Sequence, residues 1–212
     1  MNIKQEYIPA GRRNRPGRVN PMRFITVHNT GNANAGANAK AHAIYIKSDA
    51  AANEPVSWHY TVDDKEIYQH LPDNEDAFHA GDGAGNGNRQ SIGIEICMNC
   101  DGDLRKATDN AAELTAMLCA RYKIPAENIV QHNRWSGKNC PQTMRGGKPY
   151  GWSDFLAKVH SAIAPPAETA EMVAAAKNNL LYMTNNIIKD DKATLDSIEL
   201  DILWFVKNKL RG

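Results

Sequence analysis

A histidine and a cysteine lie eight residues apart in the segment QHNRWSGKNCP, residues 131–141. Gly137 between them allows the loop to turn back, so an imidazole nitrogen of His132 and the thiolate of Cys140 can bind one metal ion. A third ligand is needed, and His28 is the best candidate because it follows a predicted strand, and strand ends converge on one rim of a sheet. Two histidines and one cysteine leave a fourth position open, as in catalytic zinc sites. The thiolate favours zinc over harder cations, so we expect one Zn²⁺ per chain.

Each ligand candidate has an ordinary interpretation when it is taken alone. A single histidine is more often a surface or core residue than a ligand, and a single cysteine is more often buried packing. Lys138 and Pro141 flank the cysteine closely, and this combined spacing favours the metal.

Two further side chains could move protons or stabilise charge at such a metal. Glu95 lies in SIGIEIC, residues 91–97, where alternation places it on the face opposite Ile94 and Ile96. It is a candidate catalytic carboxylate, with a structural salt bridge as the alternative. Lys138 is tethered two residues before Cys140, so it could stabilise an oxyanion as a point charge or could be a surface lysine.

His59 and His79 are weaker candidates for contact with a substrate. Aromatic residues flank them, among them Trp58 before His59. These side chains could line a groove, or each could be a packed aromatic neighbour.

The elements that must position these residues alternate between helix, strand and hairpin, which predicts a mixed α/β class with helices packed on a central sheet. Residues 82–90 are rich in glycine and asparagine, and we expect an irregular loop there. The predicted elements are a strand over 23–27, a helix over about 35–47, a hairpin from 58–62 and 66–71, a strand over 91–97, a helix from 104 to Pro125 and a strand at 129–130.

Consecutive prolines after Ala164 predict a domain boundary. We expect a catalytic domain over 1–163, a linker over 164–168 and a helical hairpin over 169–212. Such a hairpin cannot bury both apolar faces alone, so it must dock on the main domain, a second chain or the target.

Composition excludes several broad classes. The net charge of +1 gives no general case for nucleic acid, although five arginines between residues 12 and 23 could attract an anionic polymer or could pair locally. No stretch reaches the roughly 18 apolar residues of a membrane span, and the first residues lack the apolar core of a signal peptide. We expect a protein that is made and kept in the cytosol. The four cysteines predict no disulfide framework, and Cys97 and Cys100 are interpreted as incidental thiols.

Five ordered motifs together resemble the zinc-dependent N-acetylmuramoyl-L-alanine amidases of phage endolysins and Gram-positive prophages, which share the peptidoglycan-recognition-protein fold. The resemblance covers roughly residues 1–163. Its motifs are HNTG at 28–31, WHY at 58–60, FHAG at 78–81, SIGIE at 91–95 and the segment 132–141.

The resemblance implies a central mixed sheet flanked by helices, with a groove for the glycan and the stem peptide. It implies that His28, His132 and Cys140 bind zinc, that Glu95 is the catalytic carboxylate and that Lys138 stabilises the transition state. The substrate would be bacterial peptidoglycan, cut between the lactyl group of N-acetylmuramic acid and L-alanine. Such an enzyme acts on the cell wall after release, as phage endolysins do.

Other functions stay open on the sequence. Relatives of this fold recognise peptidoglycan without cutting it, and the same metal chemistry could support a zinc endopeptidase acting on the stem peptide. A cysteine hydrolase that uses Cys140 is a third alternative. By its position, the region 169–212 would serve cell-wall targeting or self-association into a homo-oligomer.

Overall fold

The computed structural model describes residues 2–163 and residue 178. The chain divides into two units, residues 1–164 and residues 165–212. The predicted linker and the predicted helical hairpin, with its role in targeting or self-association, lie outside the described residues and stay predictions. Within 2–163 the elements are β1 Ile3–Gln5, β2 Phe24–Asn29, α1 Ala39–Ile46, α2 Asp49–Ala52, β3 Tyr60–Val62, β4 Ile67–Gln69, α3 Asn86–Gln90, β5 Ser91–Ile96, α4 Leu104–Tyr122, the 3₁₀ helix η1 Ala126–Asn128, β6 Ile129–Gln131, α5 Asn133–Ser136, α6 Gln142–Arg145 and α7 Trp152–Ile163.

Six strands form one mixed sheet in the order β1-β4-β3-β5-β2-β6. Only the hairpin partners β3 and β4 run antiparallel within this sheet, and the other neighbours are parallel. The parallel strands β2 and β5 are neighbours within the sheet, and each has a strand on both sides. The predicted mixed sheet flanked by helices is therefore confirmed.

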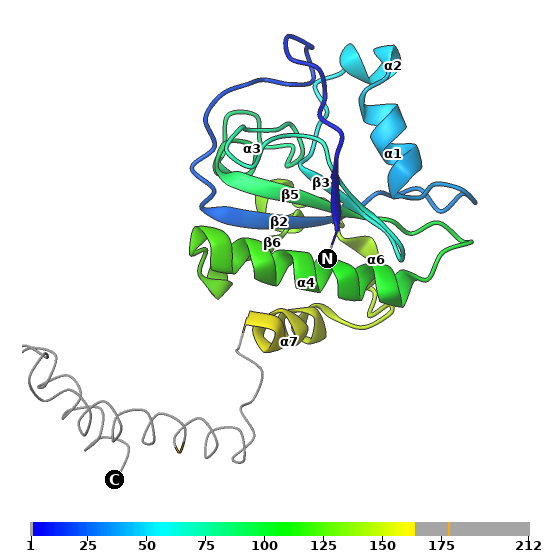
Figure 1. Cartoon of the computed structure of the whole chain (residues 1–212), viewed down its shortest axis with the longest axis vertical. Helices are drawn as coiled ribbons and strands as arrows, with labels where there is room; N and C mark the ends of the chain where they lie inside the picture. The colour runs from blue at the N-terminus through cyan, green and yellow to red at the C-terminus, as the bar shows by residue number, and fades with distance from the viewer. Residues whose placement is uncertain (1, 164–177, 179–212) are drawn as a thin grey trace, which may run out of the picture. The chain divides into compact units, whose positions relative to one another are not determined.

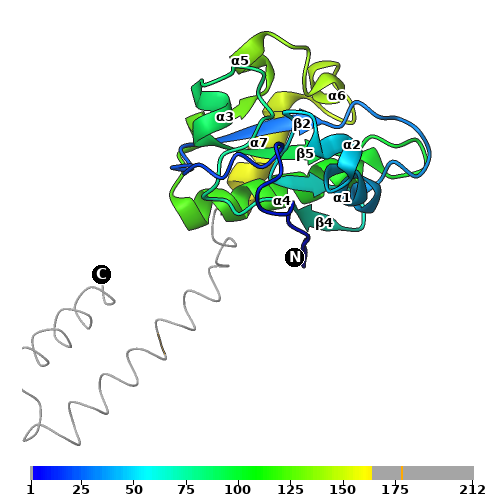
Figure 2. The same ribbon diagram turned by 90° about the horizontal axis from the view of Figure 1, so that it is seen from above.

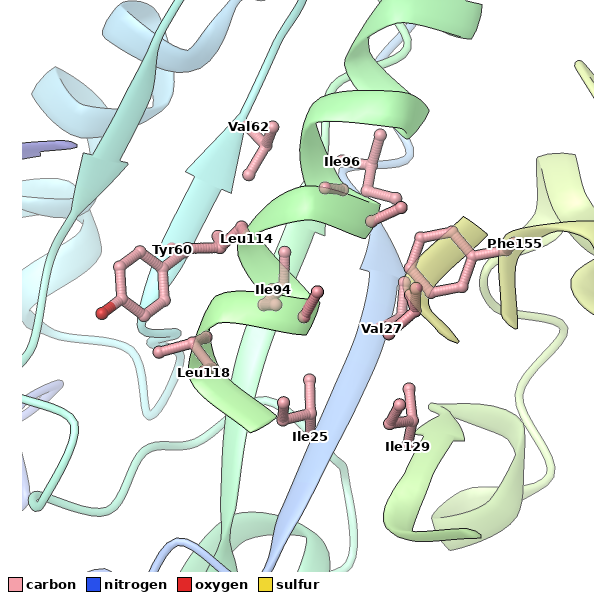
Figure 3. Close-up of a cluster of buried hydrophobic side chains, with 14 of the residues drawn as sticks. Ile25, Val27, Tyr60, Val62, Ile94, Ile96, Leu114, Leu118, Ile129 and Phe155 are labelled. Carbon is pink, nitrogen blue, oxygen red and sulfur yellow. The ribbon is translucent and has the colours of Figure 1, made fainter. Parts of the chain in front are cut away.

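One face of the sheet packs against α4 and, beyond it, α7, as Figure 1 shows. Alternate residues of β2 and β5 point to this side, so Val27 and Ile94 meet Leu114 of α4 and Phe155 of α7 (Figure 3). These side chains are fully buried. Burying each large apolar side chain contributes about 1.5–3 kcal/mol to folding, so this layer holds the central strands rigidly.

The intervening residues of the same strands point to the opposite face. Thr26 and His28 on β2 stand beside Gly93 and Glu95 on β5, and the register pairs His28 with Glu95. Figure 2 looks onto this face, with α3 on one side of β2 and β5 and with α1 and α2 on the other. The period of two predicted for residues 91–97 is thus confirmed, and it leaves polar side chains on an otherwise apolar sheet.

Two predicted boundaries were wrong. Residues 82–90 are not wholly irregular, because α3 covers 86–90. The carboxylate of Asp82 accepts hydrogen bonds from the amides of Gly87 and Asn88, at 2.7 and 3.0 Å, and so satisfies the free donors of the first turn. Helix α1 begins at Ala39 and not near residue 35, because the Asn38 side chain accepts from the Ala41 amide and caps it there.

No helix within residues 2–163 is both long enough and apolar enough to cross a membrane.

Candidate metal centre

Three side chains from separate segments converge above the carboxyl ends of the central strands. One ligand atom from each of His28, His132 and Cys140 lies within 4.8 Å of the others, and all three residues are buried. His28 is the penultimate residue of β2, and His132 follows β6, the neighbour of β2 in the sheet. The adjacency of these strand ends is what brings together two histidines 104 residues apart.

A short loop after His132 brings Cys140 back to the strand ends. Gly137 adopts a left-handed conformation, φ +74°, which costs a residue without a side chain little. The loop closes where the Asn133 amide donates to the Cys140 carbonyl at 3.0 Å. The Sγ of Cys140 then lies 3.5 Å from the Asn29 amide and 4.0 Å from His28 Nδ1.

Hydrogen bonds on the outer sides of the rings determine which nitrogens carry protons. His132 Nε2 lies 2.9 Å from the Ala80 carbonyl, which can only accept, so this nitrogen is the donor. On His28, Nε2 lies 2.9 Å from His79 Nδ1. His79 Nε2 in turn faces the Ser91 hydroxyl at 3.4 Å, and that hydroxyl donates to the Gly87 carbonyl at 2.7 Å. His79 therefore carries its proton on Nε2, and its Nδ1 accepts a hydrogen bond from the N–H of His28 Nε2.

As a consequence, the inner nitrogens of His28 and His132 carry no proton, and each presents a lone pair. His28 Nδ1 and His132 Nδ1 face each other at 2.9 Å. Two lone pairs at this distance repel each other unless a cation binds both nitrogens. Burial lowers the pKa of each histidine, and the positive charge of Lys138 acts in the same direction, so both rings are neutral near pH 7. Two neutral imidazoles and a cysteine sulfur are donors that zinc prefers, and outer hydrogen bonds of this kind orient metal ligands. The residues thus fit a zinc ion.

Glu95 lies beside the same three residues. Its Oε1 is 3.9 Å from His28 Nδ1, and its Oε2 is buried with no hydrogen-bond partner among residues 2–163. Burial raises the pKa of Glu95 to about 7, while the positive charge of Lys138 acts in the opposite direction. In the described part of the chain, Glu95 forms no salt bridge with a lysine or an arginine, so the alternative of a structural salt bridge is not supported.

A cavity of about 1100 Å³ opens over these residues. Lys138, Trp58 and His79 line it together with Glu95, His132 and Cys140, and Lys138 is exposed to solvent. His28 is only 1% exposed and does not line the cavity itself. The same cavity extends between α1 and the segment around α3. Its size suits an extended polymeric substrate better than a small metabolite.

His59 does not line the cavity, contrary to the prediction of substrate contact. It is fully buried, its Nε2 donates to the Glu75 carbonyl at 2.8 Å, and its Nδ1 accepts from the Gly93 amide at 3.0 Å. Both ring nitrogens are thus used by the backbone. His79 has the additional role, not predicted, of holding His28.

Gly93 is a residue of the site whose importance the sequence concealed. A Cβ built there would lie 2.8 Å from His79 Cγ, so only glycine lets the His79 ring pack on β5. The available signal was a glycine inside an apolar strand, which often marks a close approach.

Three of the five arginines between residues 12 and 23 form local ion pairs, which confirms the local-pairing interpretation for these three. Arg15 binds Glu75, Arg18 binds Asp76 and Arg12 binds Asp49. Cys97, Cys100 and Cys119 are free thiols, of which Cys97 and Cys119 are buried.

The chain matches known amidases in sequence and in structure. Residues 18–143 match the family model described as N-acetylmuramoyl-L-alanine amidase. The chain is 48% identical over 171 residues to N-acetylmuramoyl-L-alanine amidase CwlH and 55% identical over 159 residues to N-acetylmuramoyl-L-alanine amidase XlyA, both of Bacillus subtilis. These matches cover 80% and 75% of this chain but only 66% and 51% of the relatives. The solved catalytic domain of XlyA superposes with a TM-score of 0.70 at 52% identity, covering 75% of this chain and 99% of that domain.

Proposed function

Because the chain belongs to the N-acetylmuramoyl-L-alanine amidase family, we propose that it hydrolyses the amide bond between the lactyl group of N-acetylmuramic acid and L-alanine in bacterial peptidoglycan. The observation that carries this proposal is the meeting of His28, His132 and Cys140 beside Glu95, where His132, Cys140 and Glu95 line one cavity. Peptidoglycan is a polymer, and the cavity of about 1100 Å³ is at the upper end of the usual size of ligand pockets, about 300–1,000 Å³.

We assign the binding of one zinc ion to His28, His132 and Cys140. Bound there, zinc would act as a Lewis acid toward the scissile carbonyl and would acidify a water molecule. The chain's own contribution is to keep both Nδ1 atoms unprotonated, through the acceptors His79 and Ala80. The buried position of Cys140 keeps solvent away from the sulfur.

Glu95 is the proton carrier in this proposal. Its free carboxylate oxygen accepts a proton as water adds to the carbonyl carbon, and it then delivers that proton to the alanine nitrogen as the C–N bond breaks. A pKa near 7 allows both steps close to neutral pH. Lys138 lines the same cavity and stabilises negative charge on the carbonyl oxygen, a contribution of about 2.7–4 kcal/mol for a single donor of this kind.

Digestion of purified Gram-positive sacculi tests the proposal. The protein is used as isolated, after chelation and after zinc is restored, and the new amino termini in each digest are identified. We expect new N-terminal alanine that disappears with the chelator and returns with zinc. Glu95→Gln should bind zinc normally while kcat falls about 10²–10⁴-fold.

Other products would contradict the amidase. A new amine other than alanine would indicate a zinc endopeptidase. Tight binding to sacculi with one zinc per chain and no new amine would indicate a recognition module. Activity that survives complete removal of metal would favour a cysteine hydrolase. Action on the cell wall after release is part of the same proposal.

A further inference from the structure

Arg18 lines the cavity of the candidate metal centre but belongs to neither the ligands nor the proton carriers. Its backbone amide and its Nε donate to the two carboxylate oxygens of Asp76, at 3.2 and 2.7 Å. The Asp76 side chain is only 1% exposed, whereas that of Arg18 is 47% exposed. A buried carboxylate thus holds one edge of a guanidinium group whose other edge meets solvent in the cavity.

The guanidinium is held on its face as well. Its Cζ lies 5.5 Å from the centre of the Phe78 ring, which also lines the cavity. Phe78 is itself held in place, because its amide donates to the Ser57 hydroxyl and its carbonyl accepts from the Ser57 amide, both at 3.1 Å. Stacking and the Nε hydrogen bond together restrict the rotamers of Arg18, so binding through its free edge loses little further entropy.

The terminal nitrogens of Arg18 have no hydrogen-bond partner among residues 2–163. Arg15, three residues earlier, shows what a purely structural arginine looks like on this arm. Its Nε and Nη2 bind both carboxylate oxygens of Glu75, its Nη1 binds the Ile8 carbonyl, and it does not line the cavity. Arg18 therefore keeps two donor groups that folding does not use.

The charge of the cavity indicates what those donors meet. Its ionisable lining, apart from histidine and Cys140, is Arg18, Arg89 and Lys138 against the single carboxylate Glu95. The cavity is thus cationic, although the chain as a whole carries a net charge of only +1. Two parallel N–H groups at the edge of a planar guanidinium match a carboxylate.

We propose that Arg18 is a specificity-determining residue that binds a carboxylate of the stem peptide, beside an apolar wall formed by Phe78. Phe78 directly precedes His79, which holds His28, and Arg18 and Phe78 line the same cavity as His132 and Cys140. This inference rests on the proposed amidase function. It adds that the enzyme discriminates between stem peptides with free and with amidated carboxylates.

Matched substrates test this proposal. Synthetic N-acetylmuramoyl peptides of two, three and four residues are prepared with all carboxylates free and with all carboxylates converted to carboxamides. For the zinc-loaded wild type, we expect kcat/KM to favour the free acid about 10- to 100-fold at one or more lengths, mainly through KM. In Arg18→Gln this ratio should fall close to one, mainly because KM for the free acid rises.

Control variants separate recognition from stability. Arg15→Gln breaks a comparable ion pair outside the cavity and should lower the melting temperature without altering the ratio. If Arg18→Gln does not fold, because Asp76 is left buried and charged, the double variant Arg18→Gln with Asp76→Asn removes both charges and should show the same loss of discrimination.

The outcomes are distinguishable. A wild type that cleaves neither form at any length would overturn the amidase function and this inference with it. A wild type that cleaves both forms equally would overturn the inference alone. So would a folded Arg18 variant that keeps the wild-type ratio, or an Arg15→Gln variant that loses it.

Discussion

Substitution of Gly93 by alanine should disturb the metal centre without touching a ligand. The added Cβ would lie 2.8 Å from His79 Cγ, whereas carbon atoms pack at roughly 3.5–4.0 Å, so the ring must move by about 0.7 Å or more. His79 Nδ1 is the acceptor that holds His28 Nε2 at 2.9 Å. A shift of this size lengthens or misaligns that hydrogen bond and releases the orientation of His28.

Two effects of different size follow from this substitution. Overpacking should destabilise the fold by about 1–3 kcal/mol. Loss of a hydrogen bond that orients a ligand should weaken zinc binding about 10- to 100-fold. The Gly93 carbonyl accepts from the His59 amide, and the Gly93 amide donates to His59 Nδ1. Both bonds use only the backbone of residue 93, so the sheet itself should stay intact.

Competition with a chromophoric chelator measures the dissociation constant for zinc, and thermal unfolding of the metal-free protein measures the packing cost separately. Gly151→Ala is the matched control, because a Cβ there makes only ordinary contacts of 3.7 Å or more. Unchanged zinc affinity in a folded Gly93→Ala protein would refute the reasoning that His79 positions His28 and that glycine is needed beneath it.

Three further predictions concern the metal, one ion pair and one buried carboxylate. Cys140→Ser should weaken zinc binding by more than about 100-fold, since even outer partners change it 10- to 100-fold; zinc should raise the melting temperature of the wild type and leave that of the variant unchanged. The hydrogen bonds from Arg15 lower the pKa of Glu75 below its ordinary 4.5, so the pair stabilises the fold above that pH and the contribution is lost as the pH falls through the lower, folded-state pKa. Glu75→Gln should therefore cost about 1 kcal/mol at pH 7 and less at each step below pH 4.5, as melting curves across that range would reveal, and a difference independent of pH would contradict this account. Tyr122→Phe removes a 2.6 Å hydrogen bond to Asp73, a carboxylate only 7% exposed that also binds Tyr60; urea unfolding should show a loss of about 1.5–3 kcal/mol, and a neutral result would mean that water replaces the hydroxyl.

Much of the fold could be predicted because local patterns govern it. The strands around residues 25 and 94, the hairpin and the long helix from residue 104 each carry a clear period of two or of 3.6. The prediction of an irregular loop over 82–90 was wrong, because the helical turn there depends on the Asp82 carboxylate and not on apolar spacing. Helix α7 and strand β1 were not predicted, because short or terminal elements gain their order from the surfaces they cover.

The sequence by itself determined the kinds of donor available for a metal, since a histidine and a cysteine eight residues apart with a glycine between them can close on one ion. Only the tertiary structure decided which histidine completes the set and which protons its members carry. The adjacency of β2 and β6 selects His28, and the acceptors His79 and Ala80 leave both inner nitrogens free. The same division between residue type and tertiary packing explains why His59 lies outside the cavity and Arg18 lines it. Their residue types allow a role in the cavity, but burial removes His59 from it, whereas Asp76 and Phe78 hold the guanidinium of Arg18 at its wall. The sequence determines the chemical type of each side chain and the local periodicity of each element. Long-range packing determines how exposed a side chain is, which histidine tautomer is present and how far apart the ligand atoms lie.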